Sequence, residues 1–318
     1  MEKIYINDLI AGDVVDSTFL INNIQMRQRN NGSPFLTMEL SDRSGNIAAT
    51  MWEGFNHLDL KHIKFLRIDG RVNIYQNRPQ IIINSASYVD EKSINLSDFL
   101  PATTKDIKEM MAFINNRSTQ VKNRFLKELL QKMFEDQHFV SVFIKTPAAK
   151  SLHNAYIGGL VEHIYDMLHM ADFITEYYTG LCKDLLVTGI IFHDLGKVKE
   201  LVIDRNIEYT DEGKLLGHNI LGMDLVDKYS AMVPDFPHNI LVHIKHMILS
   251  HHGKPEWGSP KQPMTLEAVV LHYLDNMDSK IRGFQQFVEK DSSISDSWTN
   301  RSFMFDNIEL FKNICIED

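Results

Sequence analysis

Residues 190–197 of the chain read Ile-Ile-Phe-His-Asp-Leu-Gly-Lys, and an apolar run from Leu185 to Phe192 leads into this segment. The run predicts a buried helix that ends on an adjacent histidine and aspartate, His193 and Asp194. Both side chains are costly to bury unless they have partners. An isolated pair of this kind is usually a capped helix end with its carboxylate in solvent, so the rest of the chain decides whether the pair is functional.

Further histidines and acidic residues lie on or beside other apolar helical stretches. Three of the 14 histidines precede residue 150 and eleven follow it. The candidates are His163, His218, the adjacent pair His251 and His252, and Asp275. Neutral imidazole together with carboxylate suits first-row divalent metals, and such a mixed set can hold two ions that share a carboxylate. The pattern therefore predicts a metal site in this half of the chain.

The chain resembles the HD-domain superfamily of metal-dependent phosphohydrolases in the order of its candidate ligands: His163, His193, Asp194, His218, His251 and Asp275. Gly-Gly-Leu-Val-Glu-His at 158–163 and His-Asp-Leu-Gly-Lys at 193–197 also follow the order of that family. We assign His163, His193, Asp194 and Asp275 to one ion. The resemblance implies that His218 and His251 hold a second ion and that Asp194 bridges the two; whether one ion or two are bound stays open.

Some neighbouring residues have secondary roles in this interpretation. The choice of His251 over His252 rests on the resemblance alone. We expect His252, Asp278 and Glu162 to orient the ligands, because a carboxylate often fixes a metal-binding imidazole. The remaining histidines of the predicted helices are expected on faces without metal: His238, His243, His246 and His272.

Besides Asp194, two residues are candidates for a direct part in catalysis. Lys197 lies one helical turn after Asp194 and is suited to stabilise developing negative charge, although a cation near a helix end is also common without any function. His153 precedes His163 by ten residues and is a candidate to contact the phosphate or to protonate the leaving oxygen.

Residues 1–95 alternate β-branched runs with turn clusters rich in Asn, Gly, Pro and Asp. The pattern predicts five short strands, at residues 14–21, 35–40, 47–52, 66–72 and 80–83. Five strands in this length suit a small closed barrel, which leaves no exposed sheet edge.

The segment from Arg27 to Trp52 (basic loop, Gly-x-Pro-Phe strand, Asp-x-x-Gly turn, strand ending in Trp) resembles a nucleic-acid-binding OB-fold. Such barrels stack bases on aromatic rings beside basic side chains. The predicted contacts are Arg27, Arg29, Phe35, Arg43, Trp52, Tyr75 and Arg78. Aromatic residues of a small barrel can equally fill its core, and the near-neutral charge of residues 1–95 predicts moderate affinity at best.

The fold class that follows is multidomain β + α, an N-terminal five-stranded OB-fold barrel followed by an all-α HD domain. We expect residues 1–95 to form the barrel, 96–150 a linker and basic connecting helices, and 151–318 the HD domain. Residues 104–150 carry nine basic and five acidic side chains, whereas 151–318 carry 14 and 25. The basic excess could line a path for a polyanion, but a solvated helix face is the more common explanation.

The composition of the chain indicates the cellular compartment to expect. The 318 residues carry a net charge of −9, with 44% hydrophobic and 24% charged residues, as in an ordinary soluble protein. Only Cys182 and Cys315 occur, so no disulfide framework is implied. The N-terminus lacks a signal-peptide pattern, and no apolar run approaches the roughly 18 residues of a membrane span. We therefore expect a cytoplasmic protein without membrane contact.

Across its whole length the chain looks like the YhaM family of bacterial 3′-to-5′ exoribonucleases, with closest likeness at 153–163 and 249–260. The resemblance implies Mn²⁺-dependent removal of 5′-mononucleotides from the 3′ end of single-stranded RNA, with single-stranded DNA as a second substrate. One alternative is a phosphohydrolase of nucleotides or cyclic dinucleotides; another is a non-catalytic single-strand-binding protein with a structural metal. The barrel favours a polymeric substrate over a small molecule. Lys197 and the complete set of candidate ligands argue against a non-catalytic binding protein. Whether the chain forms a homo-oligomer stays open.

Overall fold

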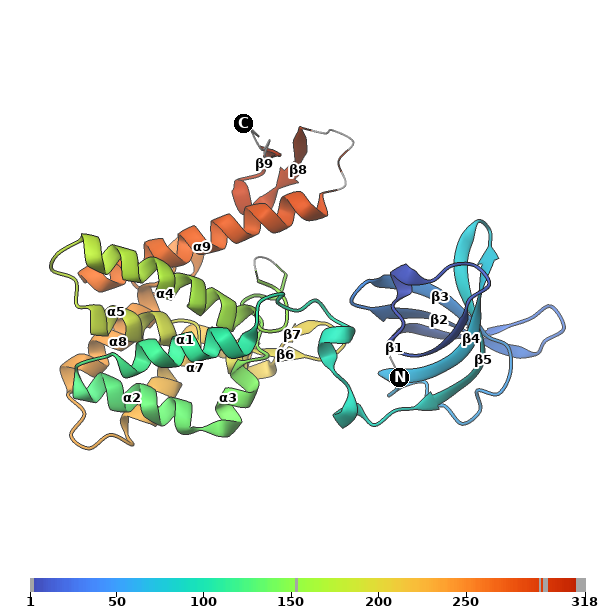
Figure 1. Cartoon of the computed structure of the whole chain (residues 1–318), viewed down its shortest axis with the longest axis horizontal. Helices are drawn as coiled ribbons and strands as arrows, with labels where there is room; N and C mark the ends of the chain where they lie inside the picture. The colour runs from blue at the N-terminus through green and yellow to red at the C-terminus, as the bar shows by residue number, and fades with distance from the viewer. Residues whose placement is uncertain (1–2, 152–153, 292, 294–296, 313–318) are drawn as a thin grey trace. The chain divides into compact units, whose positions relative to one another are not determined.

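The computed structural model describes residues 3–151, 154–291, 293 and 297–312 (Figure 1). The chain forms two compact units. Met1–Ala102 is the barrel unit and Thr103–Asp318 is the helical unit. No helix in the described part of the chain is long and apolar enough to cross a membrane.

Five strands of the barrel unit close into a barrel in the order β1-β2-β3-β5-β4. Neighbouring strands are antiparallel except β3 and β5, which run parallel. The strands are β1 Val14–Gln28, β2 Pro34–Asp42, β3 Gly45–Met51, β4 Phe65–Tyr75 and β5 Arg78–Tyr88. This confirms the predicted five-stranded barrel at the N-terminus. Short 3-10 helices flank the strands: η1 Ile6–Asp8, η2 Glu91–Ser93 and η3 Leu96–Asp98.

Alternating apolar side chains of the strands fill the barrel, among them Phe19, Leu36, Leu66 and Ile81, all fully buried. β1 runs seven residues beyond the predicted end because its last residues pair with β2 while staying exposed, and exposed pairing leaves no alternating apolar pattern. Gly70 lies at the irregularity between β4 and β5. A Cβ there would lie 2.5 Å from the carbonyl oxygen of Ile82, so only glycine allows this close approach.

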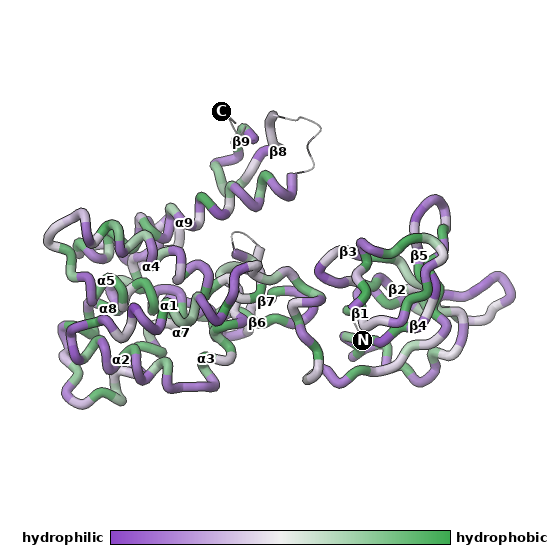
Figure 2. The backbone as a smooth tube through the Cα atoms, viewed as in Figure 1, coloured by the Kyte–Doolittle hydropathy of each residue, from purple (hydrophilic) through white to green (hydrophobic). Residues whose placement is uncertain are grey.

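Helices dominate the helical unit, and hydrophobic and hydrophilic residues alternate along most of them (Figure 2). α5 is the exception, since seven of its ten residues, Leu186 to Phe192, are buried. It packs against α1, α2, α4, α8 and α9. The helices are α1 Ile107–Thr119, α2 Arg124–Glu135, α3 Gln137–Phe143, α4 Gly159–Tyr177, α5 Lys183–Phe192, α6 Lys197–Glu200, α7 Asp211–Ser230, α8 His238–Ser250 and α9 Leu266–Lys290. The matched apolar faces form one core that includes α1, α2 and α3.

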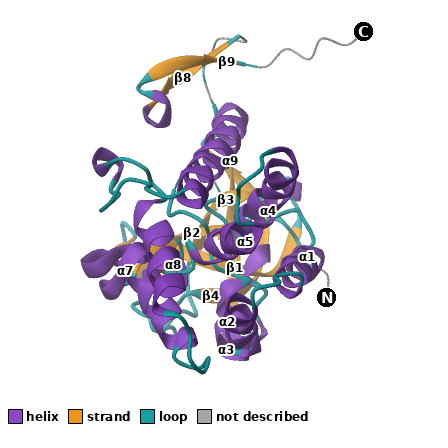
Figure 3. Ribbon diagram, turned by 90° about the vertical axis from the view of Figure 1, so that its left-hand side faces the viewer, coloured by secondary structure: helices purple, strands orange, loops and turns teal. Residues whose placement is uncertain are grey.

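Two small hairpins add strands that the sequence analysis did not predict. β6 Leu201–Ile203 pairs with β7 Ile207–Tyr209 between α6 and α7. β8 Trp298–Ser302 pairs with β9 Ile308–Phe311 beyond the end of α9 (Figure 3). Strands of three to five residues are too short to give a recognisable period, so the segment after residue 151 was predicted as all helix.

Candidate metal centre

Five segments of the helical unit bring histidine and carboxylate side chains together. His163 is on α4, and His193 and Asp194 directly follow α5. His218 is on α7, His251 caps α8 at its C-terminal end, and Asp275 is on α9. Because α5 is buried, its end delivers His193 and Asp194, 0% and 2% exposed, to the middle of the unit.

One set of ligand atoms surrounds His163. Its Nε2 lies 3.3 Å from His193 Nε2, 3.3 Å from Asp275 Oδ1 and 3.9 Å from Asp194 Oδ2. His193 Nε2 is in turn 3.4 Å from Asp194 Oδ2. Two imidazole nitrogens and two carboxylate oxygens thus enclose one small space. Such a donor set is one that divalent transition metals bind.

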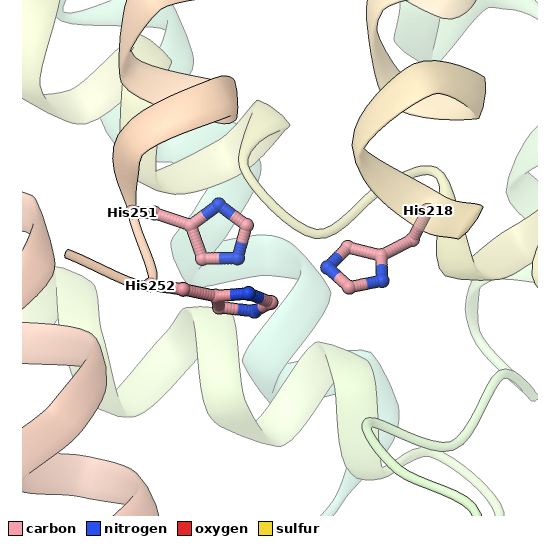
Figure 4. A group of neighbouring side chains, drawn as sticks. All are labelled: His218, His251 and His252. Atoms are coloured by element: carbon pink, nitrogen blue, oxygen red, sulfur yellow. The ribbon is translucent and has the colours of Figure 1, made fainter. Parts of the chain in front are cut away.

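A second set faces the other oxygen of the same carboxylate. Asp194 Oδ1 lies 3.5 Å from His218 Nε2 and 3.6 Å from His251 Nε2. The rings of His218, His251 and His252 face one another (Figure 4), with ligand atoms within 4.8 Å of each other. Gly217, with φ of 73°, interrupts α7 directly before His218. The two oxygens of Asp194 therefore point to different sets.

Four buried atoms of the second set have no hydrogen-bond partner in the part of the chain that the structure describes: Asp194 Oδ1, His218 Nε2, His251 Nε2 and His252 Nδ1. A buried polar atom without a partner costs about 1–3 kcal/mol. Four such atoms aimed at one space fit a cation that all of them would coordinate.

Four histidines direct Nε2 toward Asp194, and the Nδ1 of each contacts a hydrogen-bond acceptor. Such contacts fix the ring and leave Nε2 directed at the centre. The pairs are His163 Nδ1 with Asp278 Oδ2 at 2.6 Å, His193 Nδ1 with the Ile190 carbonyl at 2.7 Å, His218 Nδ1 with Glu200 Oε1 at 3.1 Å, and His251 Nδ1 with the Ile248 carbonyl at 2.6 Å.

Burial lowers the pKa of His251 and of His252 to about 3, so both rings stay neutral and keep a lone pair for a metal. Burial also acts to lower the pKa of His163, but its contacts with Asp275 and Asp278 outweigh this and raise the pKa to about 10. A proton on Nε2 beside Asp275 thus takes the place of the cation, and a bound metal would displace it.

Lys197 is the cation closest to the Asp194 carboxylate among the described ion pairs. Its Nζ lies 2.5 Å from Asp194 Oδ2. Burial acts to lower the pKa of Lys197, but the carboxylate of Asp194 outweighs it and the pKa is raised, so the ammonium stays charged. A cavity of about 170 Å³ opens beside it, lined among others by His252, Trp257 and Asp275.

Comparison with known proteins places this site in a family. The model of the HD domain matches residues 160–280, which include every ligand of both sets. A Bacillus licheniformis protein named 3′-5′ exoribonuclease YhaM is 34% identical over 307 residues, 96% of this chain and 96% of that protein. The Bacillus subtilis protein of the same name is 34% identical over 305 residues, 95% of this chain and 96% of that protein. The chain belongs to the YhaM family.

Among solved structures, the second OB-fold domain of replication protein A from Methanococcus maripaludis matches 30% of this chain and all of that domain. The sequence identity is 17% and the TM-score 0.24. The fold of the barrel in this YhaM-family chain is therefore assigned from its strand order alone.

Two predicted supporting residues make contacts other than those expected, and one predicted catalytic residue cannot be placed. His153 is outside the described residues. His252 was predicted to support the ligands, but its Nδ1 faces the same space as His218 and His251. Glu162 instead accepts hydrogen bonds from Thr103 and Tyr156.

Two residues near the site were not predicted to belong to it. Glu200, at the end of α6, holds the ring and the backbone N–H of His218. His272 holds the His251 carbonyl through its Nδ1 at 2.7 Å and lines the cavity. A glutamate at a helix end and a histidine on a helix face carry no sequence signal that separates them from solvated residues.

In the barrel, three of the predicted nucleic-acid contacts come together. The rings of Phe35 and Trp52 stack with centroids 4.8 Å apart, and the Arg29 guanidinium carbon lies 4.6 Å from the Trp52 centroid. Arg27 pairs with Phe35 in the ladder of β1 and β2. The group offers a partly exposed aromatic surface beside basic side chains.

The other predicted contacts are separate from this group in the strand register. Tyr75 and Arg78 face each other at the turn between β4 and β5. Arg43 lies at the opposite end of β2 from Phe35, with its guanidinium carbon 4.4 Å from the centroid of Tyr5.

Proposed function

We propose that this chain is a metal-dependent 3′-to-5′ exoribonuclease that removes 5′-mononucleotides from the 3′ end of single-stranded RNA and accepts single-stranded DNA as a second substrate. One observation carries the proposal: buried ligand atoms without hydrogen-bond partners in the described part of the chain converge around Asp194. The proposal is also supported by membership in the YhaM family, in which the compared relatives are named 3′-5′ exoribonucleases.

The residues present fit divalent metal. We propose His163, His193, Asp194 and Asp275 as the first set, and Asp194 with His218 and His251 as the second, to which the geometry adds His252. Mixed imidazole and carboxylate ligands suit a first-row divalent metal, and Mn²⁺ is our choice because the resemblance to the YhaM family implies it. When bound, such a pair of ions makes hydroxide available near neutral pH and neutralises charge on the phosphate.

The chain's own residues would position the substrate around that centre. Lys197 keeps its charge beside Asp194, where it can bind a phosphate oxygen as negative charge grows in the transition state. Asp278 and Glu200 hold the rings of His163 and His218 in place. We propose His153, from the sequence alone, as the group that protonates the leaving 3′ oxygen.

We propose a division of labour in which residues 1–95 bind the strand and residues 151–318 cut it, joined by residues 96–150. Arg29, Phe35 and Trp52 would stack and neutralise one part of the strand. Arg27, opposite Phe35 in the ladder, would contact the same part, and the proposed contacts elsewhere on the barrel are Arg43, Tyr75 and Arg78. With two cysteines and no disulfide framework, we assign the protein to the cytoplasm.

The test uses one oligoribonucleotide labelled at its 5′ end and, separately, at its 3′ end, with Mn²⁺ or with EDTA. The expected result is a ladder from the 5′ label and immediate release of a labelled mononucleotide from the 3′ label, both abolished by EDTA. Cleavage of a circular RNA at a comparable rate would contradict the proposal and indicate an endonuclease. Hydrolysis of mononucleotides or cyclic dinucleotides alone would favour a small-molecule phosphohydrolase, and binding without hydrolysis a non-catalytic module.

A further inference from the structure

We propose that Trp257, with Lys254 beside it, forms the subsite for the base of the 3′-terminal nucleotide. The inference deepens the proposed function and rests on it, because it names the part of the substrate that the cavity at the metal centre holds. Neither residue belongs to the two ligand sets.

The loop after α8 brings Trp257 to the cavity. Gly253 follows His252 with φ of 81°, and a Cβ at this position would lie 2.3 Å from Cε1 of His272. Only glycine therefore lets the loop pass this ring and turn into η4, Pro255–Trp257. The indole arrives in the cavity that Asp194 and Asp275 also line.

Hydrogen bonds hold this loop in shape. The backbone N–H groups of Trp257 and Ser259 both donate to the Lys254 carbonyl, at 3.0 and 3.1 Å. The Ser259 hydroxyl donates to the Leu249 carbonyl at 3.0 Å, which ties the loop back to α8. A tryptophan on a loop fixed in this way loses little further freedom when a ligand stacks on it, so stacking is favoured.

The surroundings of the indole suit a nucleobase. Trp257 is 52% exposed, although burying such a ring is favourable. Lys254 Nζ lies 4.8 Å from its centroid, and the His272 ring lies 6.2 Å away at 36°. An aromatic face beside a cation is the combination with which proteins hold single-stranded nucleic acid, since the ring stacks on the base and the cation attracts the phosphate.

The size of the cavity limits what it takes. About 170 Å³ is less than the roughly 300–1,000 Å³ of common small-molecule sites. We therefore infer one nucleotide, with its scissile phosphate toward Asp194 and Asp275 and its base on Trp257. Stacking tolerates every base, so all four 3′-terminal nucleotides should be removed.

The first test combines a change in the enzyme with a change in the substrate. The enzymes are the wild type, Trp257→Leu and Trp257→Phe; the substrates are two oligoribonucleotides that differ only in a 3′-terminal adenosine or a 3′-terminal abasic ribose. We expect Trp257→Leu to lower kcat/KM for the adenosine end about 5- to 150-fold, the range for loss of one stacked base. Trp257→Phe should retain most of the rate because it keeps an aromatic face.

The abasic end separates stacking from a structural role. Wild-type enzyme should lose a similar factor on the abasic substrate, and Trp257→Leu should lose nothing further on it. Equal losses on both substrates in Trp257→Leu, or no loss on either, would overturn the proposal.

A binding measurement keeps the subsite and the proposed function apart. In a Trp52→Phe, Trp298→Phe double variant, Trp257 is the only tryptophan of the chain. We expect 5′-AMP to quench its fluorescence in Mg²⁺ and ribose 5-phosphate to leave it unchanged. Quenching in a protein that degrades no RNA would keep the subsite and overturn the exonuclease. RNA degradation without quenching would keep the exonuclease and overturn the subsite.

Discussion

The metal centre and the nucleic-acid contacts proposed on the barrel use similar numbers of side chains in opposite ways. His163, His193 and Asp194 are at most 2% exposed, whereas Trp52 is 40% and Tyr75 63% exposed. Buried ligands are held by the core and cannot be replaced by solvent, so the loss of one should remove the function. Exposed contacts share the binding energy and are screened by salt, so the loss of one should weaken it only in part.

The largest effect should come from Asp194, whose two oxygens face both ligand sets. Asp194→Ala should reduce hydrolysis far more than the roughly 10- to 100-fold that loss of an outer partner costs. RNA binding should stay largely intact, because the barrel is unchanged. Single-turnover rates and equilibrium binding of a labelled RNA check both parts. A folded variant that retains a substantial share of the wild-type rate with Mn²⁺ would show that the carboxylate does not bridge.

Next in size is the loss of a residue that orients a ligand. Glu200→Gln should raise the Mn²⁺ concentration for half-maximal activity about 10- to 100-fold, because the His218 ring is no longer held by a carboxylate. The rate at saturating Mn²⁺ should recover. Asp278→Asn, which acts on His163, is the matched variant for the other set. A loss of rate that no concentration of Mn²⁺ restores would assign Glu200 a role in the reaction itself.

A smaller, graded effect should follow pH. In the metal-free protein His163 has its pKa raised to about 10, so its stabilising contacts are complete below about pH 6.5 and are lost as pH rises toward 10. A metal ion must displace that proton. The apparent affinity of the first set should therefore rise about tenfold per pH unit between pH 6.5 and 8.5. Thermal unfolding with and without Mn²⁺ should show a Tm increment that grows with pH; a constant increment would mean that His163 binds no metal.

The smallest effects should come from the barrel. Trp52→Ala should weaken binding of a long single strand about fivefold, since one partly exposed ring near the lower limit of stacking energy is lost. Turnover of a dinucleotide should be unchanged. Arg29→Ala and Arg43→Ala form a further pair, since only Arg29 lies on the Trp52 ring. A larger loss from Arg43→Ala would place the strand at the other end of β2.

Both folds could be predicted because each rests on a repeated apolar period. β-branched alternation with turn clusters indicated the barrel, and the apolar run ending in His193-Asp194 indicated a buried helix end. The order of the histidines came from the resemblance, since intervals of tens of residues say nothing about contact. The places of His252 and Glu200 could not be predicted. The ring of His252 is directed by the turn where α8 ends, and Glu200 matters only because α7 is interrupted at Gly217.

The most direct test of the account is a crystal of the Mn²⁺-loaded protein measured for the anomalous scattering of manganese. The ligand geometry predicts two peaks, one within bonding distance of His163, His193 and Asp275 and the other of His218, His251 and His252. Asp194 should contact both, with the ions roughly 3.5–4 Å apart as in other two-metal sites. A single peak, or two peaks of which one does not contact Asp194, would contradict a centre built on a bridging carboxylate.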